Sequence, residues 1–189
     1  MASPHFLRLN HFEPDSRVNG PGRRAVVWVQ GCTLGCPGCF NPGTHAPSGG
    51  QAVAIPALVD QIVTGPAIQG VTISGGEPLQ QLPALLALLH ELRARTFLSV
   101  LLFSGFTWDE IQRMPSAADL LAHLDVLIAG RYQAGLRQAY GLIGSTNKTL
   151  HFLTPRYTAA DLQAVPPAEI LLGPDGEIRL SGIDPLQWE

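Results

Sequence analysis

Three cysteines within eight residues constrain this chain more than any other feature of its sequence. They lie in the segment Cys32-Thr-Leu-Gly-Cys36-Pro-Gly-Cys39, and they are all the cysteines among the 189 residues. An apolar run, residues 25–30, comes immediately before them and is typical of a buried strand. Thiolates are soft ligands that select zinc, Cu(I) or iron–sulfur clusters. The segment is therefore predicted to surround one shared metal centre.

Glycine and proline residues in the same segment favour a tight backbone path. Gly31, Gly35 and Gly38 adopt positive φ without steric cost, and Pro37 presets a turn. A [4Fe–4S] cluster normally has four cysteine ligands, so three cysteines leave one iron open to another ligand. A structural Cys₃His zinc site completed by His45 is the alternative. A disulfide with one free thiol is disfavoured, because nothing in the sequence indicates secretion.

Strand-like and helix-like patterns alternate along the chain and predict an α/β fold. The expected strands are 6–12, 25–30, 71–74, 98–103, 126–129 and 149–153, and the expected helices are 55–63, 82–94, 107–114, 117–123 and 158–164. A terminal β-hairpin is expected over 169–180, around a Pro-Asp-Gly turn. Five or six β/α units are too few for a closed eight-fold barrel of about 250 residues, so we expect an open partial (β/α) barrel. We expect a single domain over 1–189, with a core over 20–153 and the C-terminal helix and hairpin in 154–189.

Composition narrows the range of partners and locations. A net charge of -3 provides no nucleic-acid-binding surface. The longest apolar stretch, Leu82–His90, is much shorter than the roughly 20 residues that cross a membrane. The first residues lack the pattern of a signal peptide, and we therefore expect a cytoplasmic protein, in the compartment that keeps thiols reduced.

A second motif, Gly75-Gly76-Glu77-Pro78, directly follows the expected strand 71–74. It leaves backbone polar groups unscreened by side chains and places a carboxylate at the carboxyl edge of the sheet, where parallel α/β sheets bind ligands. This arrangement suits a ligand with an ammonium group. The alternative is an ordinary strand-to-helix turn, with Glu77 favourably placed near a helix start.

Together the two motifs resemble those of the radical S-adenosylmethionine (SAM) superfamily. The variant Cys36-Pro-Gly-Cys39-Phe40-Asn41 resembles the small activases of the anaerobic ribonucleotide reductase type, which activate glycyl-radical enzymes. Weaker similarity to this group follows at 103–106, 125–132 and 144–147, so that the resemblance covers about residues 20–150. The chain departs from the group at Ala129, where an acid is usual, and in its C-terminal hairpin.

The resemblance implies a [4Fe–4S] cluster held by Cys32, Cys36 and Cys39, with SAM as the second cofactor. The residues expected to contact SAM are Phe40, Gly75, Gly76, Glu77, Pro78 and Ser104. Enzymes of this group cleave SAM reductively to a 5′-deoxyadenosyl radical, which takes a hydrogen atom from a glycine of a partner such as anaerobic ribonucleotide reductase. A low-potential donor such as flavodoxin or ferredoxin supplies the electron. The alternatives are a radical SAM enzyme acting on a small molecule or peptide and, third, a non-enzymatic Cys₃His zinc module.

Overall fold

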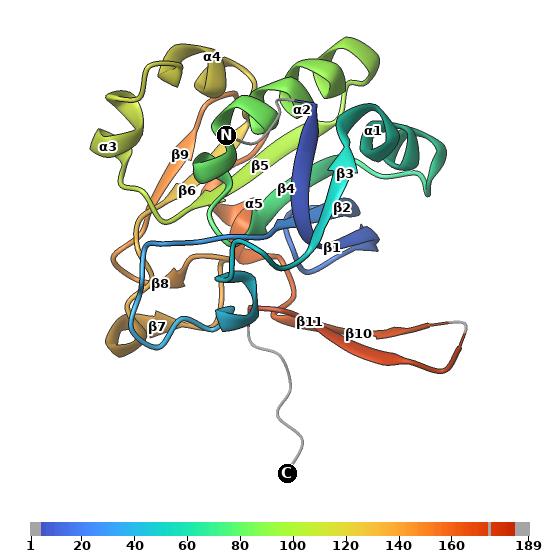
Figure 1. The fold of residues 1–189 in the computed structure, drawn as a ribbon. Helices are drawn as coiled ribbons and strands as arrows, with labels where there is room; N and C mark the ends of the chain where they lie inside the picture. Colours follow the sequence, from blue (N-terminus) through green and yellow to red (C-terminus); the bar gives the residue numbers. More distant parts are fainter. Residues whose placement is uncertain (1–4, 174, 184–189) are drawn as a thin grey trace.

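A seven-stranded sheet forms the centre of the computed structural model, which describes residues 5–173 and 175–183 (Figure 1). The strand order is β3-β1-β2-β4-β5-β6-β9. The bounds are β1 Phe6–Ser16, β2 Arg24–Val29, β3 Gln51–Ala54, β4 Gly70–Gly75, β5 Ser99–Ser104, β6 Val126–Ala129 and β9 Thr149–Phe152. The sheet is open, as the sequence predicted.

The four central strands, β2, β4, β5 and β6, are parallel. Helices link them, which parallel pairing requires. These helices are α1 Ile55–Thr64, α2 Leu82–Arg95, α3 Trp108–Gln112 and α4 Ala117–Ala122. The strands β1 and β9 run antiparallel to their neighbours, because no helix lies between β1 and β2 or between β6 and β9 except a short 3-10 turn. The parallel part therefore holds four strands, and two of the expected strands, β1 and β9, are antiparallel to it.

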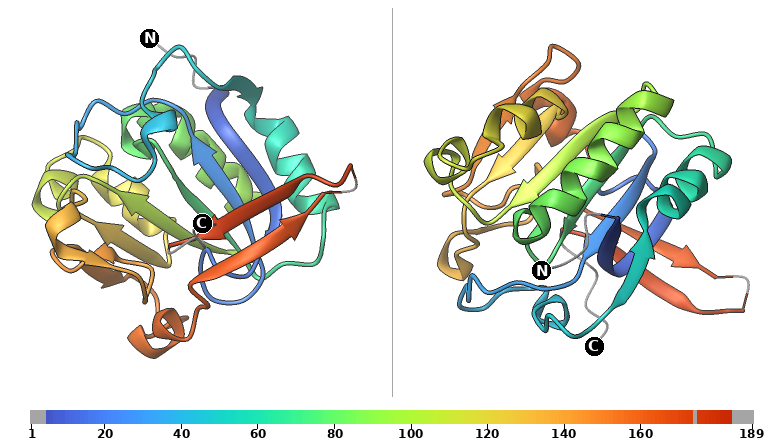
Figure 2. Two further views of the ribbon diagram at one scale, coloured as in Figure 1. Left: turned by 90° about the horizontal axis from the view of Figure 1, so that it is seen from below. Right: turned by 45° about the horizontal axis from the view of Figure 1, so that its top comes forward.

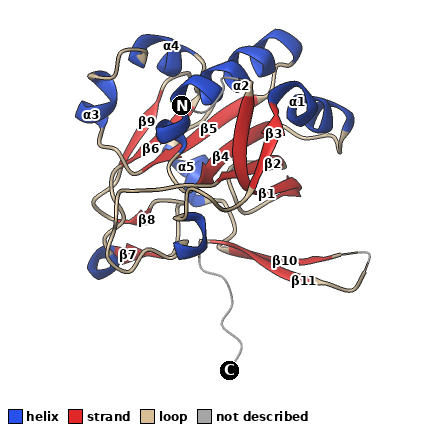
Figure 3. Cartoon of the chain, viewed as in Figure 1, coloured by secondary structure: helices blue, strands red, loops and turns tan. Residues whose placement is uncertain are grey.

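The helices α1 to α4 cover one face of the sheet and enclose the main core (Figures 1 and 3). Each helix turns an apolar side toward the sheet; α2, for example, buries Leu85, Leu88, Leu89 and Leu92. A fully buried leucine stabilises the fold by about 1.5–3 kcal/mol. Within the described residues no helix has the length and hydropathy needed to cross a membrane, and α2, at 14 residues, is the longest.

The opposite face of the sheet is covered in two different ways. Over β5 and β6, the helix α5 (Ala159–Gln163) closes a smaller apolar cluster with Leu142. Over β1 and β2 lies the hairpin of β10 (Ala168–Leu172) and β11 (Ile178–Gly182), which crosses the sheet in the left panel of Figure 2. The two-residue strands β7 (Arg137–Gln138) and β8 (Gly144–Ser145), which the sequence did not predict, pair beside the cysteine segment (Figure 1).

Arg24, at the start of β2, is completely buried on this second face. Its guanidinium donates hydrogen bonds of 2.8 Å to Thr72 Oγ1, Ser99 Oγ and the carbonyl oxygen of Val71, and the ring of Tyr157 lies 5.9 Å away. Burial lowers the pKa of Arg24. The side chain thus joins the amino ends of β2, β4 and β5.

We predict that Arg24→Ala lowers the free energy of unfolding by about 2–4 kcal/mol, because it leaves several buried polar groups unpaired. Urea denaturation of anaerobically prepared protein, followed by circular dichroism, measures the change. Arg23→Ala is the matched control, since Arg23 pairs with Asp15 at the surface, and it should change stability little. Equal effects of the two substitutions would contradict this account of Arg24.

Candidate functional site

The predicted site residues gather around one cavity at the carboxyl ends of β2, β4 and β5. Its volume is about 1080 Å³, and its lining includes all three cysteines, Gly75–Glu77 and Ser104. The hairpin β10–β11 and the inner side of β1 form its far wall. The cavity therefore lies where an open parallel sheet is expected to bind ligands.

The cysteine segment follows the backbone path that its glycines predict. Gly31, Gly35 and Gly38 have φ values of 100°, 63° and 69°. The amide of Cys32 donates to the carbonyl of His45 over 3.1 Å, and the amide of Cys39 donates to the carbonyl of Cys36 over 3.2 Å. All three thiols are free and partly buried, and burial raises the pKa of Cys32.

Two glutamines beside the motifs hold this segment in place, and the sequence analysis missed them. Gln30 Nε2 donates to the carbonyls of Gly43 and Ala46, at 3.2 and 2.7 Å, and so closes the loop that follows the cysteines. Gln80 accepts from the amide of Thr33 at 3.1 Å and donates to its hydroxyl at 2.8 Å. Gln30 stands two residues before Cys32, and Gln80 stands two residues after Pro78. This closeness to the two motifs was the sequence feature that could have indicated their role.

The turn after β4 contacts the end of β2 and the start of the cysteine segment through the amides of Gly76 and Glu77. The amide of Gly76 donates to the carbonyl of Val29 over 2.8 Å, and the amide of Glu77 donates to the carbonyl of Gly31 over 2.9 Å. A Cβ atom on Gly75 would lie 2.5 Å from the amide nitrogen of Val29, and one on Gly76 would lie 2.4 Å from the oxygen of Gly31. Only glycine fits at these two positions without moving backbone.

Glu77 is fully buried and bridges two loops. Its Oε1 accepts hydrogen bonds from the amide of Leu79 and the hydroxyl of Ser104, each of 2.9 Å, and its Oε2 accepts from the amide of Gly105 over 2.7 Å. Burial raises the pKa of the Glu77 carboxyl, and these hydrogen bonds oppose the rise. The sequence analysis expected this carboxylate at the carboxyl edge of the sheet. It lies there, and its oxygens are hydrogen-bonded to the turn and to the loop after β5.

The other residues assigned to SAM differ in how far they reach the cavity. Phe40 lines it, is 51% exposed and stands edge-on to Tyr132, with 5.0 Å between ring centroids. Ser104 also lines it, but its hydroxyl is already bonded to Glu77 and to the amide of Phe106. Pro78 is buried and starts the 3-10 helix after Glu77.

Lys148 is a cavity residue that the sequence analysis did not assign to the site. Its side chain lines the cavity together with the thiols and Glu77. Burial lowers the pKa of its ammonium group, and the nearby Cys36, Glu77 and Cys39 raise it. Among the described residues its ammonium group has no hydrogen-bond acceptor, which leaves it available to an anionic group inside the cavity.

The three thiols are not arranged as the compact ligand set of a single zinc ion. Among the described residues, the only three ligating side chains whose donor atoms all lie within 4.8 Å of one another are His90, Asp119 and His123. The three cysteine sulfurs are therefore more widely spaced than the about 3.8 Å of a tetrahedral zinc site with Zn–S bonds of about 2.3 Å. His45, the fourth ligand of the zinc alternative, is not among the residues that line the cavity.

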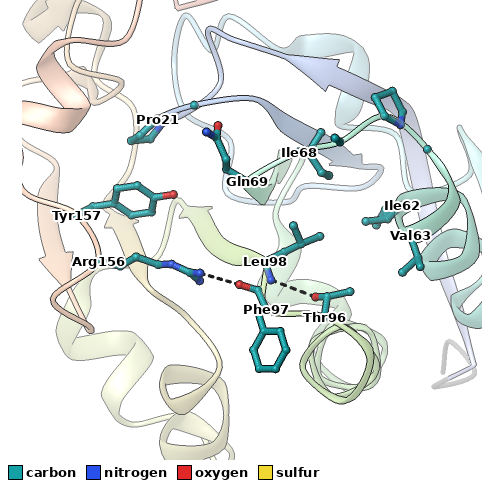
Figure 4. Close-up of a pocket in the computed structure, with 14 residues that line it drawn as sticks. Pro21, Ile62, Val63, Ile68, Gln69, Thr96, Phe97, Leu98, Arg156 and Tyr157 are labelled. Atoms are coloured by element: carbon teal, nitrogen blue, oxygen red, sulfur yellow. Dashed lines mark hydrogen bonds between the residues drawn. The ribbon is translucent and has the colours of Figure 1, made fainter.

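A histidine–aspartate cluster and a second hollow lie away from this site. His90 Nε2 lies 2.9 Å from a carboxylate oxygen of Asp119, and His123 Nδ1 lies 2.7 Å from the Asp119 carbonyl, so these side chains join α2 to α4 on the outer surface. A second hollow, of about 820 Å³, lies at the amino ends of the parallel strands (Figure 4). Among the described residues that line it, Arg156 is the only charged one, and it donates to the carbonyl of Phe97 over 2.8 Å.

Comparisons with known proteins cover the part of the chain that holds both motifs. A family model described as a 4Fe-4S single cluster domain matches residues 18–151. The anaerobic ribonucleoside-triphosphate reductase-activating protein of Escherichia coli strain K12 is 32% identical over 157 residues, which cover 78% of this chain and 99% of that protein. The protein of the same description from Enterobacteria phage T4 is 31% identical, over 76% of this chain and 93% of its own length. The pyruvate formate-lyase-activating enzyme of Staphylococcus epidermidis is 40% identical over 94 residues, or 46% of this chain and 37% of that enzyme.

We predict that Gly76→Ala lowers the iron and sulfide bound per chain after anaerobic reconstitution. The added methyl group would overlap the Gly31 backbone, and relieving such overpacking typically costs about 1–3 kcal/mol, here by displacing the cysteine segment. Gly43→Ala is the matched control, because a Cβ atom there has nothing within 4 Å. Normal iron content in both variants would show that contact with the turn is not needed to shape the cysteine segment.

Proposed function

The chain belongs to the radical SAM activating proteins of glycyl-radical enzymes, within the 4Fe-4S single cluster domain family, and from this premise we propose that its substrate is an anaerobic ribonucleotide reductase. It is an enzyme whose cofactors are a [4Fe–4S] cluster and SAM. The observation that carries the proposal is the joining of three thiols and a Gly-Gly turn at one cavity, in a chain that matches 99% of the length of such an activating protein.

We propose that Cys32, Cys36 and Cys39 hold the cluster and leave one iron for SAM. Bound together, the two cofactors would supply one-electron reductive cleavage of SAM, whose products would be methionine and a hydrogen-abstracting 5′-deoxyadenosyl radical. The protein orients SAM and excludes water around it.

We assign the SAM contacts according to the charges that the cavity presents. The partly exposed backbone of Gly75 and Gly76 receives the ammonium group, while Glu77 holds that backbone in place from behind. We propose that the ammonium group of Lys148, which has no hydrogen-bond acceptor among the described residues, binds the carboxylate, and that Phe40 offers an aromatic surface. Ser104 acts through Glu77, because its hydroxyl is bonded there.

A macromolecular substrate suits the incomplete enclosure of the cavity. Phe40 is half exposed and the cysteines are only partly buried, so a partner residue can approach the site from solvent. The chain has no cysteines beyond these three, and we propose that an external low-potential donor, such as flavodoxin or ferredoxin, reduces the cluster in the cytoplasm. We also propose a single domain, since the hairpin packs back on β1.

We predict that Lys148→Met weakens SAM binding about tenfold or more, since a hydrogen bond to a charged group contributes about 1.5–3 kcal/mol. Anaerobic calorimetry measures the affinity, and iron analysis checks that the cluster content is unchanged. Arg113→Met is the control, because Arg113 is exposed and should leave the affinity as it is. Unchanged SAM affinity in a fully loaded Lys148→Met variant would remove Lys148 from the site.

The function itself is tested by electron paramagnetic resonance. Reduced protein, SAM and the anaerobic ribonucleotide reductase of the same organism should give a glycine-centred radical. Cys36→Ser should abolish the signal, because a hydroxyl is a poor substitute for a soft thiolate on iron, whereas His45→Ala should retain it. Absence of the signal, with deoxyadenosine formation stimulated by a small molecule instead, would favour the small-molecule alternative.

A further inference from the structure

The C-terminal hairpin lies outside the family match over 18–151, yet it forms one wall of the cavity. We propose that the hairpin β10–β11 is the element that docks the glycyl-radical partner. This inference rests on the function proposed above and adds where, and by what chemistry, the partner is held. Three observations carry it: a free strand edge, an exposed apolar face and a shared wall with the reaction cavity.

The inner face of the hairpin is fixed to the body of the protein by polar contacts. Glu169 accepts hydrogen bonds from the hydroxyl of Ser16, at 2.5 Å, and from the amide of Arg17, at 3.0 Å. Arg179 Nη1 lies 3.3 Å from a carboxylate oxygen of Glu13, which is itself buried. These contacts determine which face of the hairpin is turned outward.

The outer face is apolar and exposed. Strand pairing places Ile170 opposite Leu180, and Leu172 opposite Ile178, on the side that faces away from β1. Ile170, Leu172 and Ile178 are 47%, 74% and 61% exposed. Cross-strand apolar pairs normally stabilise a sheet by packing against something, but in the described part of the chain this face is left to solvent.

The free edge of β11 follows from the ladder of hydrogen bonds. The amide of Ile183 donates to the carbonyl of Pro167, and the amide of Gly173 donates to the carbonyl of Glu177. These two bonds fix which residues of β11 are hydrogen-bonded to β10 and which are not. Antiparallel strands bond their partners at every second residue. The N–H and C=O groups of Leu180 and Gly182 therefore point away from β10, and no hydrogen bond joins them to another described residue.

This free edge lies along the cavity. Five consecutive residues, 179–183, line it, whereas one face of a strand would contribute only every second residue. An extended segment of the partner that paired with Leu180 and Gly182 would run beside the wall of the cavity that contains the thiols. Strand addition at a sheet edge, with side-chain contacts on a neighbouring apolar face, is a common way to bind an extended peptide.

The first test removes the apolar face with the triple substitution I170S/L172S/I178S. We expect its affinity for anaerobic ribonucleotide reductase to fall at least tenfold in biolayer interferometry, while iron content and partner-free cleavage of SAM under dithionite stay within twofold. Phe97→Ser is the matched control, since Phe97 is 94% exposed at the far end of the strands, and it should leave the affinity unchanged.

The second test addresses the edge alone. Leu180→Pro removes a free N–H without removing a bond to β10, and edge strands tolerate proline at such positions. It should weaken partner binding, whereas Leu180→Ala, which keeps the N–H, should weaken it less.

Unchanged partner affinity in both the triple and the proline variants would overturn the proposal. So would light scattering that finds a dimer of the wild-type chain converted to monomer by the triple substitution, with partner affinity intact, because the face would then bind a second copy. Failure of the wild-type chain to form a glycyl radical would instead overturn the proposed function, so that the two failures are distinguishable.

Discussion

The structure of the site depends on the contact between the turn after β4 and the strands on either side of it. Gly76 and Glu77 donate their amides to the β2 side, at Val29 and Gly31, while the Glu77 carboxylate accepts from Ser104 and Gly105 on the β5 side. Three neighbouring strands are thus joined at their carboxyl ends by one dipeptide. A buried carboxylate is costly unless its oxygens are bonded, and here both are, so the charge stabilises one arrangement of the three loops.

The two faces of the sheet differ in role: one holds the main apolar core, and the other holds the polar groups around the cavity. The helix-covered face is apolar and carries most of the buried leucines and valines. The other face carries Arg24 at the amino ends of the strands and Glu77 and Lys148 at the carboxyl ends, around the cavity. Because the main core is complete on one side, the opposite side retains polar and charged groups that a two-sided apolar sheet would exclude.

Local patterns in the sequence predicted both motifs and most of the elements, though not the short strands β3, β7 and β8, because apolar runs, glycines and cysteine spacing act over a few residues. Long-range placement was not predictable in the same way. The sequence did not indicate that Arg24 is buried, because its partners, Thr72 and Ser99, lie 48 and 75 positions away. Lys148 follows a run of polar residues typical of a surface loop, and only the fold brings it to the cysteines. The sequence predicted the hairpin, but no local pattern indicated that it packs on β1.

The packing of the hairpin on β1 affects the order in which the walls of the cavity form during synthesis. Glu169 contacts Ser16 across 153 positions, and Arg179 contacts His11 across 168, whereas Gly31 and Thr33 are held by residues 77 and 80. Chains fold during synthesis from their amino-terminal parts onward. The cysteine segment and the loops that shape it are complete once residue 105 has been made, while the far wall still awaits the last residues. The side of the cavity that the hairpin covers therefore stays open until residues 168–182 have been made.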